Sequence, residues 1–337
     1  MISSLCDICN QKHKKKLVKL PMSKFIVGDG SKILNAKKNY YFCRNTNFFV
    51  TDANISWKKN LNKIYQNIKY NNKGVYKGNI TRENTIVQLI RKSNINVDNI
   101  LEIGPGPGLL LKRLNSLKEI KTLDVLEINN NFLREFRKNN KFKKLYLNIS
   151  EIKKKYNLII LSHSFFHIKT LNKFVKQLYN LLELNGNIFI ATPDPLNFHI
   201  LPYVYEVYSF SNKRNIINYF KKFNLYLEKD FQSILKNEIV ILFSRKKKNK
   251  KTKPDNKFLK NFKLTQKKFY LLHKNLKKHK ALIIHGAGLH GKFFYFTLKN
   301  KVFKIYDDNF NINLKSNKKL INIKPKKIFK TYDFSLK

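Results

Sequence analysis

The chain has 337 residues, of which 42% are hydrophobic and 13% aromatic, so its composition excludes a disordered chain and supports packed cores. No apolar run approaches the roughly 20 residues that cross a bilayer, and the first residues, MISSLCDICNQKHKKK, do not follow the order of a signal peptide. Three cysteines are too few for a disulfide scaffold. We therefore expect a soluble, cytoplasmic protein.

The formal net charge of +48 ordinarily indicates a nucleic-acid or anionic-membrane partner. Lysine, however, outnumbers arginine more than seven to one and is spread from end to end, whereas RNA-binding surfaces rely on arginine. Because A/T-rich codons favour lysine, asparagine and isoleucine alike, codon bias explains the excess. Nucleic acid is therefore not the expected partner, although how much of the charge is functional stays open.

Four segments differ in composition and predict the domain organisation. Residues 1–80 hold all three cysteines and the single tryptophan, and we expect them to form a small N-terminal module. Residues 81–245 alternate strand-like and helical patterns, as successive βα units do. Residues 246–257 are charged and contain Pro254, which indicates an exposed linker. Residues 258–337 are predicted to form a second, shorter α/β unit.

The sharpest local pattern is a glycine-rich turn between a strand and a helix. The predicted strand 100–103 leads into Gly104, Gly106 and Gly108, and a helix with an apolar face follows. Alternate glycines allow a sharp turn and a close ligand, and the helix N-terminus offers N–H groups to an anion, either a pyrophosphate or a carboxylate. Glu102, just before the glycines, would repel a pyrophosphate, whereas it suits the ammonium of S-adenosylmethionine.

Later strands carry two more candidate cofactor ligands. The strand 122–127 ends in Glu127, about 20 residues after the glycines, where an acid can accept both hydroxyls of a ribose. The next strand ends in Asn148, which could reach the adenine amine. Unbroken or nearly unbroken apolar runs predict further strands, and these lie at 145–148, 156–161 and 188–191.

Four sequence elements resemble successive motifs of the class I S-adenosylmethionine-dependent methyltransferases. They are EIGPGPG, the acid Glu127, YNLIILSHSFFHI and LELNGNIFIATPD, in the family's order over about 100 residues. The resemblance implies a seven-stranded, mostly parallel, Rossmann-like sheet that binds S-adenosylmethionine at the C-terminal ends of its strands. It assigns cofactor binding to Glu102, Gly104, Gly106, Gly108, Glu127 and Asn148. EIGPGPG also resembles the rRNA adenine dimethylases, but their proline-containing loop after the fourth strand is absent here.

The overall layout resembles the sugar C-methyltransferases that act on nucleotide-linked keto-sugars. That family has a Cys-rich module, a methyltransferase domain and a C-terminal Rossmann-like domain, and two C-x-x-C turns of the module hold a structural zinc. Cys6, Cys9 and Cys43 match three of the ligands, whereas Thr46 stands at the fourth position. Either another residue such as His13 completes a zinc site, or the turns are degenerate and pack on their apolar residues.

The same resemblance implies a catalytic base, because methylation beside a ketone requires removal of a proton from the sugar carbon. His167 matches the family's His after the fourth strand, and Glu206 matches its Glu after the fifth. The His expected beside that Glu is Val207 here, and valine cannot move a proton. The base is then another residue, such as His163 or Tyr205, or the reaction is not C-methylation.

The C-terminal segment holds a second strand–turn–helix pattern. Gly286, Gly288 and Gly291 form a G-x-G-x-x-G turn, with an acid about 20 residues on. The segment resembles the last domain of the sugar C-methyltransferases and the start of sugar acyltransferases. This resemblance implies a nucleotide or nucleotide-sugar site with Lys292 near phosphate. The alternative is a half-domain that packs on the catalytic domain and binds nothing.

We expect an S-adenosylmethionine-dependent methyltransferase that acts on a small polar acceptor, with a nucleotide-linked sugar among the candidates. Two alternatives stay open. One is an RNA methyltransferase or a polyanion-binding protein with this fold, whose affinity would fall steeply with salt. The other is a dinucleotide-dependent sugar enzyme, against which Glu102 and the lack of a Tyr-x-x-x-Lys pair argue. The sequence leaves open the acceptor, the methylated atom and the oligomeric state.

Overall fold

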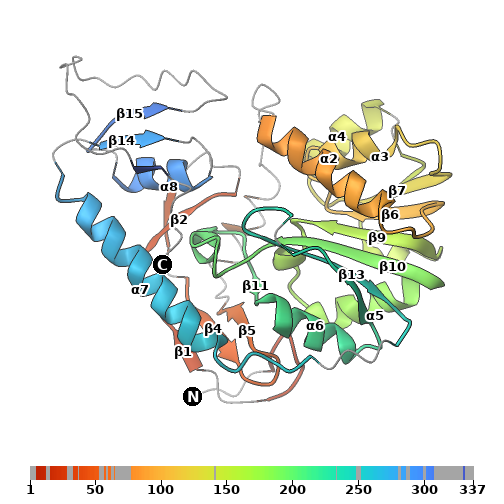
Figure 1. Ribbon diagram of the computed structural model, residues 1–337, viewed down its shortest axis with the longest axis horizontal. Coiled ribbons are helices and arrows are strands. Elements are labelled where there is room, and N and C mark those ends of the chain that lie inside the picture. The colour runs from red at the N-terminus through yellow and green to blue at the C-terminus, as the bar shows by residue number, and fades with distance from the viewer. Residues whose placement is uncertain are drawn as a thin grey trace.

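The computed structural model describes residues 5–12, 16–28, 33–36, 38–52, 57, 60, 61, 64, 77–139, 142–232, 234–247, 252–279, 282–285, 289–298, 301–306 and 329–330. A seven-stranded sheet forms the centre, with a four-stranded, a three-stranded and a two-stranded sheet beside it (Figure 1). Within this described part of the chain, no helix is both long and apolar enough to cross a membrane.

The central sheet has the strand order β12-β13-β10-β9-β6-β7-β8. The strands are β6 Asn99–Ile103, β7 Thr122–Leu126, β8 Lys144–Tyr146, β9 Tyr156–Ser162, β10 Leu182–Pro193, β12 Tyr226–Asp230 and β13 Glu238–Ser244. From β10 to β8 all pairs are parallel, and β13 is antiparallel to both of its neighbours. Parallel strands that are buried on both faces require apolar runs. The apolar runs in the sequence were the basis for the five strands predicted above. The seven-stranded, mostly parallel sheet is therefore confirmed.

Helices cover both faces of the central sheet (Figure 1). On one face lie α2 Lys77–Arg91, α3 Leu109–Leu114 and α4 Asn130–Asn139, and on the other lie α5 Leu171–Leu181 and α6 Lys213–Lys221. Three short 3₁₀ turns, η2 Ile149–Glu151, η3 Phe165–His167 and η4 Leu201–Tyr203, fall in the connections. This layering leaves the carboxyl ends of the parallel strands free for the βα turns, where open α/β sheets bind their ligands.

The N-terminal segment forms a sheet that it shares with the central segment. The strands β1 Lys16–Val18, β4 Tyr40–Cys43 and β5 Phe48–Thr51 are completed by β11 Ser209–Phe210, while β2 Lys24–Ile26 pairs with β3 Ile33–Asn35. Both β4 and β5 are buried along their whole length. The predicted boundary at residue 80 stays a prediction, and α2 crosses it. The shared sheet explains how N-terminal residues can reach the central segment's functional site.

The C-terminal segment contains α7 Phe258–Leu276, β14 Leu282–His285, α8 Leu289–Thr297, β15 Val302–Tyr306 and β16 Phe329–Lys330. Its three strands are parallel, in the order β15-β14-β16. Helix α7 packs beside the N-terminal sheet, where the rings of Phe262 and Phe49 lie 4.2 Å apart (Figure 1). The predicted linker is anchored at its end, because the Asp255 carboxylate accepts a 2.6 Å hydrogen bond from Asn212 Nδ2.

Candidate active site

A cavity of about 400 Å³ opens at the carboxyl ends of β6, β7 and β9. One wall, the glycine-turn side, is formed by residues of the segments 102–110 and 126–132. A second wall, the histidine side, is formed by Gly28, Glu206 and residues of the segment 162–168. Arg82 and Glu83 of α2 also line the cavity. The structure therefore brings most of the predicted cofactor-binding and catalytic residues together in one place.

All three predicted glycines of the turn have the backbone conformation that favours glycine. The φ angles of Gly104, Gly106 and Gly108 are +67°, +56° and +72°. A Cβ on Gly104 would lie 2.8 Å from the Ser164 Cβ, and one on Gly108 would lie 2.7 Å from the Phe136 ring. A Cβ on Gly106 would meet nothing within 4 Å. Gly106 therefore presents bare backbone to the cavity, as a closely approaching ligand requires.

Glu127 lies at the end of β7 and is oriented by backbone donors. Its Oε1 accepts from the N–H groups of Ile128 at 2.7 Å and Asn129 at 2.8 Å, and its Oε2 accepts from Gly106 at 3.3 Å. Burial raises the pKa of Glu127, while these N–H donors oppose the rise. The carboxylate lines the cavity beside the glycine turn, in a position that fits its predicted role toward a ribose.

Glu102 is a buried acid without a counter-ion of its own. Its side chain is 1% exposed, and Oε2 has no hydrogen-bond partner among the described residues. Burial raises its pKa well above the ordinary value, Glu83 and Glu127 raise it further, and Arg82 opposes them. A buried acceptor without a partner is costly. A ligand that brings a cation to this wall removes that cost, so the residues present fit the ammonium of S-adenosylmethionine.

Asn148 is placed differently from the prediction. Its side-chain oxygen accepts from the Ser150 N–H at 3.1 Å and caps η2, and the residue is not among those that line the cavity. Asparagine at a turn competes for nearby backbone donors, and here that local bond forms. This placement does not support the predicted contact with the adenine amine.

On the histidine side, His167 and Glu206 are connected through the backbone. His167 Nδ1 lies 3.0 Å from the Glu206 carbonyl oxygen, which can only accept, so this nitrogen carries the proton. Burial lowers the pKa of His167 to about 4, and Lys38 and His163 lower it as well. The Glu206 carboxylate accepts from the Gly28 N–H with both oxygens, at 2.8 and 3.0 Å.

Lys38 holds the loop that carries Glu206, and no sequence pattern indicated this role. Its ammonium donates to the carbonyl oxygens of Val204 at 2.9 Å, Tyr205 at 3.0 Å and Val207 at 2.7 Å. Only the charged form has three donors for three acceptors. Burial lowers the pKa of Lys38 well below its ordinary value, and the Glu206 carboxylate opposes this shift.

Tyr205 is next to Glu206 in the chain, but unlike the other three candidate catalytic residues it does not line the cavity. It is 2% exposed, and it is not among the residues that line the cavity. Its ring lies 6.1 Å from that of Trp57 and 6.5 Å from that of Phe25, and its N–H donates to the Ile26 carbonyl. Tyr205 therefore packs within the N-terminal part of the structure, which does not support a catalytic role.

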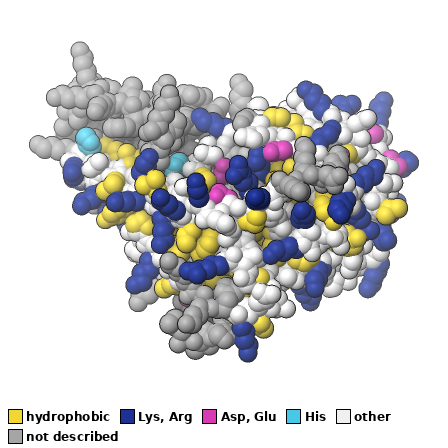
Figure 2. Space-filling view, turned by 60° about the horizontal axis from the view of Figure 1, so that its bottom comes forward, with side chains coloured by type: hydrophobic (Ala, Val, Ile, Leu, Met, Phe, Trp, Pro, Cys, Tyr) yellow, Lys and Arg dark blue, Asp and Glu magenta, His cyan; other side chains and the backbone are white. Residues whose placement is uncertain are grey.

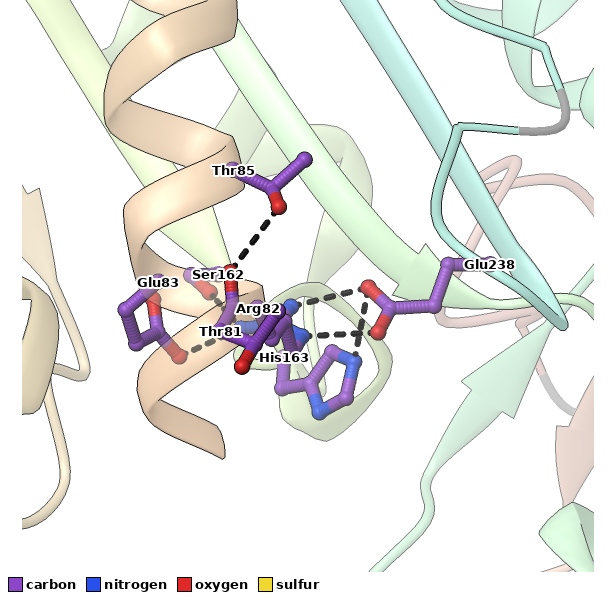
Figure 3. Close-up of polar contacts among 7 residues, drawn as sticks. All are labelled: Thr81, Arg82, Glu83, Thr85, Ser162, His163 and Glu238. Carbon is purple, nitrogen blue, oxygen red and sulfur yellow. Dashed lines mark hydrogen bonds and ion pairs between the residues drawn. The ribbon is translucent and has the colours of Figure 1, made fainter. Parts of the chain in front are cut away.

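His163 belongs to a network of charges at the end of β9 (Figure 3). Its Nε2 lies 3.0 Å from Glu238 Oε2, and Arg82 binds both oxygens of Glu238, at 2.7 and 2.8 Å. Arg82 Nη1 also donates to Glu83 at 2.6 Å and to Ser162 Oγ at 3.0 Å. The φ of His163 is +55°, in the left-handed region that side chains other than glycine seldom occupy. Neither Arg82 nor Glu238 was predicted.

The three cysteines come together in two similar turns. Their sulfur atoms all lie within 4.8 Å of one another. The Cys6 carbonyl accepts from the Asn10 N–H at 2.8 Å, and the Cys43 carbonyl accepts from Asn47 at 2.7 Å. Asn10 and Asn47 both have a φ of +56°. The second turn therefore repeats the first, with Thr46 at the position of the fourth cysteine.

This arrangement supplies three of the four ligands of a tetrahedral zinc site. Hydrogen bonding with Cys6 and burial raise the pKa of Cys43 well above its ordinary value. The Thr46 hydroxyl is close enough to the Cys43 thiol to lower that pKa in part. A neutral hydroxyl is a weaker zinc ligand than a thiolate. Zinc binding by Cys6, Cys9 and Cys43 therefore stays a prediction, and His13 lies outside the described residues.

The predicted C-terminal nucleotide site is only partly described. Gly286 and Gly288 lie outside the described residues, while Gly291 is buried in α8 and Lys292 is half-buried in the same helix. The order of strand β14, turn and helix α8 agrees with the sequence pattern. Nucleotide binding at this place stays a prediction.

The family model described as a methyltransferase domain matches residues 53–232, which is more than half of the 337-residue chain. The chain therefore belongs to the methyltransferase domain family. With the fold and the cofactor wall described above, it is an S-adenosylmethionine-dependent methyltransferase, and S-adenosylmethionine is its cofactor. No curated protein sequence matches the chain.

Several solved structures are similar to this one. An S-adenosylmethionine-dependent methyltransferase from Clostridium acetobutylicum is 16% identical, with 56% of this chain and 98% of that chain covered and a TM-score of 0.40. An S-adenosylmethionine-dependent methyltransferase from Leishmania major is 16% identical, with 56% and 83% covered and a TM-score of 0.44. The CcbJ methyltransferase from Streptomyces caelestis is 13% identical, with 48% and 88% covered and a TM-score of 0.40.

Proposed function

We propose that this methyltransferase acts on a small polar acceptor and that His163 removes the acceptor's proton. The observation that carries this proposal is the pairing of His163 with Glu238 at the cavity wall, at 3.0 Å. In a neutral ring the nitrogen that faces the carboxylate keeps the proton, and Nδ1 is then the basic atom. Nδ1 lies on the side of the ring that points away from Glu238 (Figure 3).

Glu238 supports His163 as a base because it favours the protonated ring that forms during the reaction. Although burial raises the pKa of Glu238, His163 and Arg82 together hold it well below its usual range. An ionised carboxylate beside an imidazole stabilises the imidazolium. His167, by contrast, has a pKa of about 4, so it binds a proton poorly at neutral pH. We therefore assign His167 and Glu206 to the shape of the acceptor's site.

The charges of the cavity disfavour an acceptor whose reacting part is anionic. Glu83, Glu102, Glu127 and Glu206 are among the described residues that line it, with Arg82 as the cation and no lysine. Figure 2 shows lysine and arginine side chains spread over the face of the molecule that it presents. Because carboxylates repel phosphate, we place the diphosphate of a nucleotide-linked sugar outside the cavity and its sugar inside.

For a keto-sugar acceptor, His163 Nδ1 would take the proton from the carbon beside the ketone. The carbanion would then attack the methyl group, and S-adenosylhomocysteine would leave. The bound cofactor supplies the electrophilic methyl on its sulfonium. What the chain supplies is the alignment of the two reactants and the proton acceptor. The same arrangement would serve a hydroxyl or an amine, so the acceptor panel must include these groups.

The test is methyl transfer, measured as S-adenosylhomocysteine formed with nucleotide-linked keto-sugars, free sugars, small amines and RNA. We expect turnover with a small acceptor, and a loss of about a hundredfold or more in His163→Asn, which lacks the base. His167→Asn should lose less turnover, because we assign His167 to the shape of the acceptor's site and not to proton transfer. Turnover with RNA alone would overturn the acceptor class, and equal losses in the two variants would overturn the choice of His163.

A further inference from the structure

Two buried carboxylates line the cavity, and each has an oxygen without a partner. Glu83 on α2 is 9% exposed, and Glu102 on β6 is 1% exposed. Oε2 of each residue has no hydrogen-bond partner among the described residues. Glu83 contributes to raising the pKa of Glu102, so the two carboxylates are close enough to repel each other. Their proximity is costly in the absence of a cation.

The nearest cation is already committed to other groups. Arg82 directs Nε and Nη2 at Glu238, at 2.7 and 2.8 Å, and Nη1 at Glu83 Oε1 and Ser162 Oγ. The network thus holds three carboxylates, Glu83, Glu102 and Glu238, against one guanidinium. No described donor, Arg82 included, reaches the Oε2 atom of either Glu83 or Glu102, so this part of the wall lacks a cationic partner.

We propose that Glu83 and Glu102 together bind the α-ammonium of S-adenosylmethionine, so that Glu83 is a cofactor-binding residue. An ammonium has three N–H donors, and the two Oε2 atoms accept two of them. Glu102 and the glycine turn belong to the sequence motif, whereas Glu83 comes from the preceding helix. Arg82 fixes the Glu83 side chain through Oε1 and leaves Oε2 to the ligand. The inference rests on the methyltransferase function, and it does not depend on the acceptor or on His163.

Calorimetric titration of Glu83→Gln with three ligands tests this role. S-adenosylmethionine has both the ammonium and the carboxylate, decarboxylated S-adenosylmethionine keeps the amine alone, and 5′-methylthioadenosine has neither. We expect the variant to bind the first two about tenfold more weakly, since a hydrogen bond to a charged group is lost, and to bind 5′-methylthioadenosine as the wild type does. Glu119→Gln is the matched control, because Glu119 pairs with Arg91 at the other end of α2 and should leave all three affinities unchanged.

The pattern of losses separates a ligand contact from a structural role. Equal weakening of all three ligands would mean that Glu83 only supports the fold, and unchanged affinities would mean that it does not touch the ammonium. Either result overturns the inference. Glu83→Asp keeps the charge on a shorter side chain and should bind the two amines better than Glu83→Gln does. Failure of the folded wild type to bind S-adenosylmethionine would overturn the cofactor assignment itself.

Discussion

The two walls of the cavity are built in different ways. The glycine-turn side comes from one stretch of sequence, in which Glu102, the glycines and Glu127 follow one another across two strands and a helix. The histidine side is assembled from distant parts of the chain, and Gly28 and Glu206, which are hydrogen-bonded, lie 178 residues apart. Local backbone geometry therefore forms the glycine-turn side, whereas long-range packing forms the histidine side.

The largest expected effect follows from removing the cation that holds the histidine side. Lys38→Met leaves three buried carbonyl oxygens without their donor, and we expect a loss of about 3 kcal/mol in the free energy of unfolding. Methyl transfer should fall with it, because the loop that carries Glu206 is released. The folded fraction of the variant should bind the cofactor with an affinity within about twofold of the wild type, since Lys38 does not line the cavity.

Denaturant unfolding and cofactor titration of the same variant separate the two walls. Lys19→Met removes an exposed lysine of the N-terminal segment and should change neither quantity. A Lys38→Met protein as stable as the wild type would show that the carbonyl oxygens find other donors. If the Lys38→Met variant is fully folded and still loses much of its cofactor affinity, the two walls are not independent.

The strands, the glycine turn and the two acids of the cofactor wall could be predicted because their signals are local. A buried parallel strand needs an apolar run, and a left-handed turn needs glycine, so each can be recognised within a few residues. Asn148 was predicted to reach the adenine amine, but its side chain bonds within its own turn, to the Ser150 N–H. This competition depends on the exact course of the backbone after β8, which the pattern does not determine.

The histidine side could be predicted only in part. His163, His167 and Glu206 were candidates because of the resemblance to the sugar C-methyltransferases, but Lys38 is one among 69 lysines and arginines. Its role depends on a sheet whose last strand, β11, is contributed by a segment far along the chain. Arg82 and Glu238 likewise meet across 156 residues. No local pattern marks a charged side chain whose partner is that distant.

A second prediction addresses the glycine-turn side alone, through Glu102→Gln. We expect affinity for S-adenosylmethionine to fall roughly tenfold to a hundredfold, because a buried charged partner of the ammonium is lost. The unliganded protein should become more stable at pH 7. A carboxyl group whose folded pKa is raised stabilises the fold while protonated and loses that contribution as pH rises through its folded pKa. Above the ordinary pKa of a glutamate, Glu102 therefore costs the fold stability that glutamine, which does not titrate, retains.

Calorimetry and thermal unfolding across pH 5 to 8 test both halves of this prediction. In the wild type, cofactor affinity should rise with pH, because protonated Glu102 cannot attract the ammonium, and the slope should not exceed tenfold per pH unit for one proton. In Glu102→Gln this slope should become shallower. A variant that is less stable than the wild type and still binds the cofactor tightly would contradict the assignment of Glu102 to the ammonium.

The smallest expected effect on either wall comes from completing the cysteine site with Thr46→Cys. Its turn already has the geometry of the Cys6 turn, so the new thiol should complete a tetrahedral set with Cys6, Cys9 and Cys43. We expect about one tightly bound zinc per chain, against weaker binding in the wild type, measured by metal analysis after dialysis against a chelator. Zinc should raise the thermal midpoint of the variant by several degrees, because a metal that binds only the folded state stabilises it.

Cofactor affinity should be unchanged in this variant, because none of the four positions lines the cavity. Thr46→Ser keeps a hydroxyl at the same place and should bind zinc no better than the wild type. If Thr46→Cys and the wild type retain the same amount of zinc, either three thiolates already suffice for tight binding or the side chain at position 46 faces away from the metal. A change in methyl transfer on zinc binding would show instead that the N-terminal sheet transmits the state of the cysteine turns to the histidine side, through the loop that Lys38 holds.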